Sequence, residues 1–192
     1  MKKRIIFYLL TGIFYQYTYA QLTKSNWMVG GNGNFSTASF TQLGDETKTT
    51  NLSISPAIGY FFADRFSAGI RVFVSNYHTT DANPTTGTSG VGNDFSLSLG
   101  PFARYYLLDH VDRNVNVFVE ANYGYGYSTD IDRIKQYLNR FSLNAGPVLY
   151  LNNSVGLEFS LGYYQSHQYG IQTTGLQAGL GFQIHLEKEK FK

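Results

Sequence analysis

The stretch Gly175-Leu-Gln-Ala-Gly-Leu-Gly-Phe-Gln-Ile-His-Leu186 alternates strictly between two kinds of residue. Its even positions carry Leu, Ala, Phe or Ile, and its odd positions carry Gly, Gln or His. Successive side chains of a β-strand point to opposite faces, so this period of two predicts a strand with one apolar face and one small, polar face. The fold then depends on which of the two faces points outward.

Similar period-two segments continue along the chain and are separated by clusters of turn-forming residues. We predict eight strands, at residues 26–40, 49–62, 65–78, 93–107, 113–128, 137–151, 154–167 and 174–187. Their connections alternate between short ones, at 63–64, 108–112 and 152–153, and longer ones, at 41–48, 79–92, 129–136 and 168–173. This arrangement predicts an all-β fold, an eight-stranded antiparallel up-and-down barrel with both termini at the short-turn end.

The polar face decides the orientation of the barrel wall. In the strand interiors, away from the strand ends, its only charges are Arg71, Arg104, Glu120, Arg140 and Glu158, and most of its other residues are Gly, Ser and Asn. A soluble barrel would place Lys and Glu on a face in water, whereas small side chains and a few paired charges fit the narrow interior of an eight-stranded barrel. Aromatic residues gather at both ends of the apolar face, as at membrane interfaces. The sequence therefore predicts a transmembrane β-barrel with its apolar face toward lipid.

Two local features of this wall carry further expectations. Pro56, Pro101 and Pro147 recur at similar depth, and because proline cannot donate to a sheet ladder they predict bulges or locally irregular strands. Gly31 and Gly33 lie on the lipid-facing side of the first strand. They could leave a shallow groove for a partner, but we expect a neighbouring aromatic ring to cover them.

Residues 1–20 have the pattern of a secretory signal peptide. Met1-Lys-Lys-Arg4 is basic, residues 5–15 form a short apolar core, and Ala20 supplies the small residue before cleavage. The mature chain, residues 21–192, would form the barrel and keep 12 cations against 13 acids, a net charge of −1. The basic charge of the precursor therefore gives no support to nucleic-acid binding. The lack of cysteine excludes disulfides, thiolate metal sites and a cysteine nucleophile.

At this point the chain resembles the small outer-membrane β-barrel proteins of Gram-negative envelopes, with a barrel domain like that of outer-membrane protein A, part of the porin-like barrel group. The resemblance covers the whole mature chain. It rests on the signal peptide, the run from Gly100 to Tyr106 and the C-terminal strand. In that strand, Gln177, Gly179, Phe182 and Ile184 are similar to the signal by which the family's insertion machinery recognises its clients. Residues 187–192 follow, where the family commonly ends on an aromatic residue.

The resemblance implies an outer-membrane location after export across the inner membrane, and contacts with outer-membrane lipid and lipopolysaccharide. Carboxylates in predicted loops, Asp45, Glu46, Asp130 and Asp132, could bind Ca²⁺ or bridge lipopolysaccharide through divalent cations, but we favour ordinary loop solvation for them. Other outer-membrane proteins are further expected partners. We expect no cofactor and no protein-bound metal, because no repeated His spacing suggests a metal site.

The chemistry-bearing residues favour a non-enzymatic protein. Ser166 and His167 are adjacent in sequence, but alternation points them to opposite faces, which disfavours a direct Ser–His pair. The other histidines are expected at the rim (His78), in a short turn (His110) and low in the interior (His185). We expect an envelope-structural or interaction role, with membership of a larger outer-membrane complex as one form of it. The alternatives are a narrow channel or carrier for small or hydrophobic solutes, and a lipid-modifying enzyme.

Overall fold

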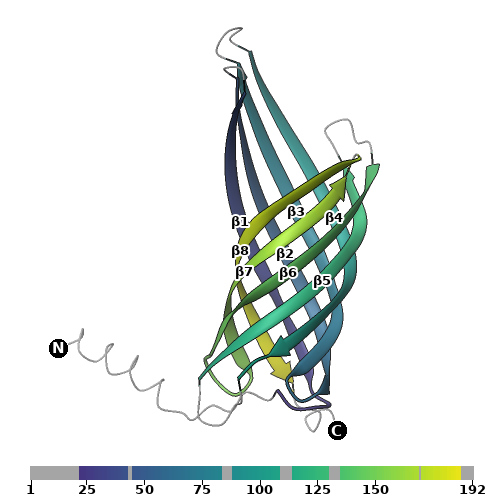
Figure 1. Ribbon diagram of the computed structural model, residues 1–192, viewed down its shortest axis with the longest axis vertical. Coiled ribbons are helices and arrows are strands. Elements are labelled where there is room, and N and C mark those ends of the chain that lie inside the picture. Colours follow the sequence, from purple (N-terminus) through teal and green to yellow (C-terminus); the bar gives the residue numbers. More distant parts are fainter. Residues whose placement is uncertain are drawn as a thin grey trace, which may run out of the picture.

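The computed structural model describes residues 22–42, 45–83, 88–108, 114–129, 135–168 and 170–186, which form one closed antiparallel barrel. Each strand pairs with the next in sequence order, and β8 pairs back to β1 (Figure 1). The strands are β1 (Trp27–Gln42), β2 (Asp45–Ala63), β3 (Phe66–Asn83), β4 (Thr88–Tyr106), β5 (Val115–Thr129), β6 (Lys135–Tyr150), β7 (Val155–Gln168) and β8 (Ile171–Leu186). The predicted fold class is confirmed. The predicted signal peptide, residues 1–20, and His110, Asp130 and Asp132 lie outside the described residues.

The alternation in sequence becomes an inside and an outside of the wall. In β5 the side chains of Asn116, Phe118 and Glu120 are buried, whereas Val115 and Val119 are exposed on the outer surface. The exposed large apolar side chains of the other strands include Leu52, Ile54, Ile70, Leu99, Leu143, Phe159, Leu176 and Leu180. An apolar outer band around a polar interior is the arrangement that a hydrocarbon surrounding requires. No helix in the described ranges is long and apolar enough to span a membrane.

The strands are longer at their loop ends than the sequence predicts. Segments 41–48 and 79–92, predicted as loops, are largely strand, and β2 and β4 begin at Asp45 and Thr88. These segments are rich in threonine, a β-branched residue that favours extended structure. Turn-forming composition led us to place the loops there, but cross-strand pairing continues through them, as in the pair Thr80 and Val91.

The bulges predicted at the three prolines are not present. Ile54 pairs with Val74 before Pro56 and Ala57 pairs with Arg71 after it, so both strands advance by the same number of residues. The same holds around Pro101 and Pro147. Each proline removes ladder hydrogen bonds without inserting a residue, so the wall is interrupted locally but keeps its register. The register shift that the β2–β3 ladder does contain lies between Phe61 and Ala63, beside the short turn.

The ring closes over only part of the length of β1. This strand pairs with β2 along its whole length, to Gln42 opposite Asp45, but its pairing with β8 ends at Asn34 opposite Gly179. The β4–β5 ladder likewise begins only at Phe95 opposite Thr129. The loop-end halves of β1–β4 therefore continue beyond the closed barrel as a four-stranded sheet, which forms the tall part of the molecule in Figure 1.

If the outer wall faces hydrocarbon, the cost of a charge on it depends on depth. Leu99, in the middle of β4, and Leu151, in the short β6–β7 turn, are both about half exposed. We expect Leu99→Arg to lower the free energy of unfolding in lipid vesicles by about 2–4 kcal/mol, and the control Leu151→Arg by at most about 1 kcal/mol. Denaturant titration of the vesicle-inserted protein measures both. Equal effects of the two variants would contradict a lipid-facing wall.

Candidate functional site in the barrel interior

The short-turn half of the interior is packed with apolar and aromatic side chains. The buried set comprises Leu22, Met28, Ala57, Phe61, Phe102, Tyr106, Phe118, Val148 and Tyr150. Phe61 stacks on Tyr106 with ring centroids 6.1 Å apart, and the ring of His185 meets Phe61, Tyr106 and Tyr150 edge-on at 5.6–6.2 Å. Inward-facing rings from several strands thus fill the cross-section at this end.

The segment that precedes β1 closes the same end from below. Leu22 is buried, and its carbonyl accepts a hydrogen bond from the Arg65 amide at 2.8 Å. Ser25 donates its amide to the Phe61 carbonyl, and Phe61 donates to the Asn26 carbonyl, both at 2.9 Å. Residues 22–26 are therefore tied to the β2–β3 turn and lie beneath the aromatic packing.

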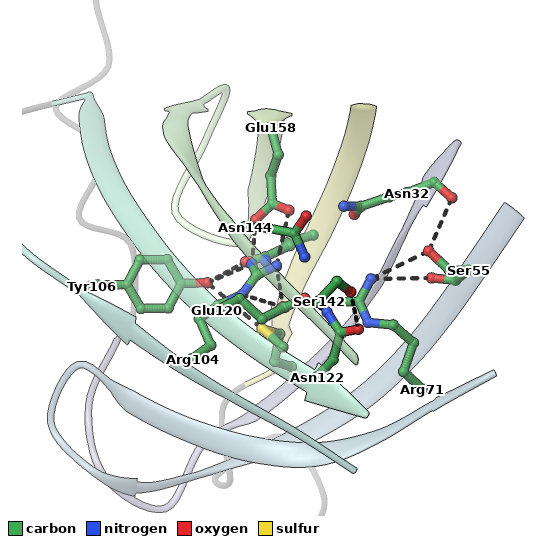
Figure 2. Close-up of polar contacts among 12 residues, drawn as sticks. Asn32, Ser55, Arg71, Arg104, Tyr106, Glu120, Asn122, Ser142, Asn144 and Glu158 are labelled. Atoms are coloured by element: carbon green, nitrogen blue, oxygen red, sulfur yellow. Dashed lines mark hydrogen bonds and ion pairs between the residues drawn. The ribbon is translucent and has the colours of Figure 1, made fainter. Parts of the chain in front are cut away.

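A cluster of four charged side chains lies above these rings. Glu120 accepts from both arginines, since its Oε2 is 2.8 Å from Arg71 Nη2 and 2.8 Å from Arg104 Nε. Arg104 also donates from Nη1 and Nη2 to the Glu158 carboxylate, at 2.5 and 3.3 Å. All four side chains are at most 3% exposed. The cluster is neutral and spans the interior from β3 to β7 (Figure 2).

Neighbouring side chains make further contacts to this charge cluster and hold it in place. Arg104 lies over the Phe118 ring at 4.2 Å and donates to the Tyr106 hydroxyl at 3.3 Å. The Tyr106 hydroxyl donates in turn to Gln183 on β8. Buried charges are tolerated when they are paired and hydrogen-bonded, so this network makes the cluster a fixed part of the interior.

The fifth predicted interior charge, Arg140, does not join the cluster. Its Nη2 donates to Gln177 Oε1 at 2.5 Å, and its guanidinium lies over the Tyr164 ring at 4.2 Å. In the part of the chain that the structure describes, it has no carboxylate within ion-pair distance. Of the five residues grouped from the sequence, the structure brings four together and leaves Arg140 apart, nearer the loop end.

Between the cluster and Arg140 lies a small polar cavity. Two arginines line it, Arg71 from below and Arg140, and the rest of its wall is mainly Ser, Asn and Gln. The other lining residues are Asn32, Asn34, Ser53, Ile54, Ser55, Phe73, Ser75, Asn122, Ser142, Asn144, Ser160 and Gln177. The space open to the centre of a water molecule is only about 20 Å³. A cavity of this size holds one or two water molecules.

The four residues of the predicted insertion signal lie on both faces of β8. Gln177 and Gly179 face the interior, where Gln177 joins Arg140 to Asn144, whereas Phe182 is exposed on the outer wall. Ile184 is partly exposed and pairs with Val29 across the closing seam. Recognition by insertion machinery remains a prediction.

The groove suggested by the two glycines of β1 is open. Around Gly33, no aromatic ring atom lies within 4 Å of where a Cβ would stand, so the ring that we expected to cover this site is absent there. A lateral groove of about 360 Å³ runs along this seam, lined by residues such as Gly31, Pro56, Leu180 and Phe182. Phe182, which pairs with Gly31, lines the groove together with the two glycines.

The remaining candidate residues do not assemble a reaction centre in the described ranges. His78 is exposed and hydrogen-bonds to Asn93 at 2.8 Å, and His167 is exposed and pairs with Asn139. Ser166 pairs with Arg140, so it faces the interior while His167 faces outward. No group of three or more His, Cys, Asp or Glu side chains that could hold a metal is found among the described residues.

Sequence reasoning missed several members of this interior. Tyr106 and Gln183 lie two residues from Arg104 and His185, so alternation points their side chains inward as well. We did not select them as site residues because they carry no charge. The packing of residues 22–26 against the short-turn end could not be predicted from the alternation of residues, because this segment precedes the first strand.

A closed ring of eight antiparallel strands, an apolar outer wall and an interior filled by aromatic packing and a paired charge cluster define a small transmembrane β-barrel. Among solved structures, the outer-membrane protein OprG from Pseudomonas aeruginosa has a TM-score of 0.53 with 11% identity, over 86% of this chain and 97% of that one. Neisserial surface protein A (NspA) has a TM-score of 0.52 with 14% identity, over 82% and 96% of the two chains. These likenesses show that the chain has the fold of a small eight-stranded β-barrel. No protein-family model and no curated protein matches the sequence.

The charge cluster predicts a non-additive pair of substitutions. Glu120→Leu leaves Arg71 buried without its carboxylate, so we expect the free energy of unfolding to fall by about 3–5 kcal/mol. In the double variant Glu120→Leu with Arg71→Met, the Arg104–Glu158 pair stays balanced and the loss should be smaller. Denaturant unfolding of the refolded variants measures this. A double variant less stable than Glu120→Leu alone would contradict mutual neutralisation in the cluster.

Proposed function

We propose that this protein is a non-enzymatic integral outer-membrane protein that acts as an interaction module, with its barrel as anchor and the projecting β1–β4 sheet as its contact surface. The observation that carries the proposal is the continuation of four strands beyond the closed ring. In a barrel whose interior is filled, the part that stands clear of the membrane is the part left to meet other molecules.

The filled interior argues against transport as the main role. The aromatic packing, the neutral charge cluster and the segment 22–26 occupy successive levels of the short-turn half. An eight-stranded interior is just wide enough for its own side chains, and opening this one would separate buried charges from their partners. We therefore favour an interaction role over a channel.

The projecting sheet has the properties of a binding surface. Its edges are β1 beyond Asn34 and β4 before Phe95, where the described backbone has no neighbouring strand of the ring. Unpaired strand edges can accept an extended segment of a partner through main-chain hydrogen bonds. From Asn34 to Gln42, β1 offers about 25 Å of such an edge at roughly 3.3 Å per residue.

The expected partners follow from this placement. Outer-membrane lipid and lipopolysaccharide would surround the wall, and insertion machinery would engage β8 during assembly. Another outer-membrane protein would meet the projecting sheet, which makes the chain a subunit of a larger complex. A role as a lipid-modifying enzyme is disfavoured by the opposite orientations of Ser166 and His167.

Shortening the sheet should separate anchoring from interaction. Replacing residues 37–50 by Asn-Gly joins the paired residues Ser36 and Asn51, and replacing residues 79–92 by Asn-Gly joins His78 and Asn93. We expect both variants to keep a folded barrel, because the closing ladder from Trp27 to Asn34 is untouched. We expect each to lose proteins that co-purify with the intact chain from the native envelope in mild detergent.

A photo-crosslinking residue localises the contact. Placed at His78, which is exposed in the projecting sheet, it should capture a protein partner, whereas at Leu180 on the lipid-facing wall it should not. A clean monomer from the native envelope, or cross-links only at Leu180, would contradict the proposed contact surface.

Because its interior is filled, we expect the barrel not to conduct ions. Reconstituted in planar bilayers, the intact protein should give no discrete conductance steps. We expect Glu120→Ala, which disrupts the cluster, to remain silent as well, because the aromatic packing and segment 22–26 still close the short-turn end. Stepwise conductance of the intact protein that changes in Glu120→Ala would establish a channel instead.

A further inference from the structure

The cavity above the charge cluster has an unusual balance of charge. Its wall includes two guanidinium groups, from Arg71 and Arg140, and no carboxylate lines it. Both cluster carboxylates are turned away from it into ion pairs, Glu120 with Arg71 and Arg104, and Glu158 with Arg104. Since those four charges cancel, Arg140 adds a positive charge that no described carboxylate compensates.

The hydrogen bonds around Arg140 have a direction that the chemistry fixes. A guanidinium can only donate, so the oxygen of Gln177 must face Arg140, at 2.5 Å. The Gln177 amide nitrogen then donates to Asn144 Oδ1 at 2.7 Å. This leaves the Asn144 Nδ2 group as a donor without a described partner, in a side chain that lines the cavity. The chain of bonds thus ends in a partly exposed N–H group that an acceptor in the cavity could use.

Arg71 supplies a second free donor at the same cavity. Its Nη2 binds Glu120 at 2.8 Å and its Nη1 reaches Ser55 Oγ at 3.3 Å, whereas its Nε is buried and has no hydrogen-bond partner. The side chain is only 3% exposed. An unsatisfied buried N–H of a charged group is costly, and an acceptor in the cavity would remove that cost.

Together these groups form a small anion site. We propose that the cavity binds one monatomic anion of halide size, held by the positive charge of Arg140 and by the free N–H groups of Arg71 and Asn144. The limited space, about 20 Å³ for a water-sized centre, suits a single small sphere rather than a tetrahedral oxyanion. Such an ion would neutralise the loop-end half of the interior as Glu120 and Glu158 neutralise the half below it.

Bromide is the direct probe, because its anomalous scattering identifies it in crystals of the refolded, detergent-solubilised barrel. We expect one bromide peak in the cavity of the intact protein, within hydrogen-bonding distance of Arg71 Nε. Arg140→Met should abolish or strongly reduce the peak, since methionine keeps the apolar stem against Tyr164 but carries no charge. Arg65→Gln, which removes a positive charge at the short-turn end, is the matched control and should keep it. A map without a cavity peak, or a peak that persists in Arg140→Met, overturns the proposal.

Thermal unfolding gives an independent readout in case a variant does not crystallise. Replacing a bulky organic anion by chloride at constant ionic strength should raise the melting temperature of the intact protein and of Arg65→Gln. In Arg140→Met and Asn144→Leu the halide affinity drawn from this dependence should be at least about tenfold weaker, as expected when a charge-assisted or buried hydrogen bond is lost. Equal chloride dependence in all four proteins would count against a specific site.

Discussion

The structure depends on closure of the hydrogen-bonded ring. In hydrocarbon, no water is present to satisfy a free backbone N–H or C=O, so a sheet can cross only if its first and last strands meet. Here β1 and β8 meet between Trp27 and Asn34, and this short ladder completes the wall. Eight strands joined in this way leave a narrow interior, and the narrowness explains both its small polar lining and its paired charges.

The same closure separates two kinds of surface. Below Asn34 and Phe95 every strand has two neighbours, and the side chains are sorted into an apolar exterior and a packed interior. Above these residues the ring is no longer complete, and β1–β4 continue as an open sheet. The function that we propose uses this division, because the closed ring would serve as the anchor and the open sheet, with its accessible edges, would serve as the contact surface.

The alternation of residues predicted the strands, their order and the orientation of the wall, because one period-two pattern covers each crossing. It also placed Arg71, Arg104, Glu120 and Glu158 inside, but it could not give their depth. The stagger between neighbouring strands fixes how deep each side chain lies along the barrel axis. It places Arg140 nearer the loop end than the other four charges. Threonine-rich segments were predicted as loops, because the polar composition that marks a turn also suits a strand in water. Residues 22–26 are held at the short-turn end by backbone hydrogen bonds, which do not depend on residue type and so cannot be predicted from the sequence.

The shortness of the β1–β8 ladder bears on how the molecule assembles. All other ladders join neighbours in the chain and can form as hairpins, whereas this one joins residues from opposite ends of the sequence, such as Trp27 and Leu186. Contacts of such long sequence separation carry the largest loop-closure entropy and form slowly. We therefore expect the pairing of β1 with β8 to be the slow, entropically costly step of barrel formation. Gly30 lets the two backbones approach closely there, because a Cβ at that position would collide with the carbonyl oxygen of Phe182.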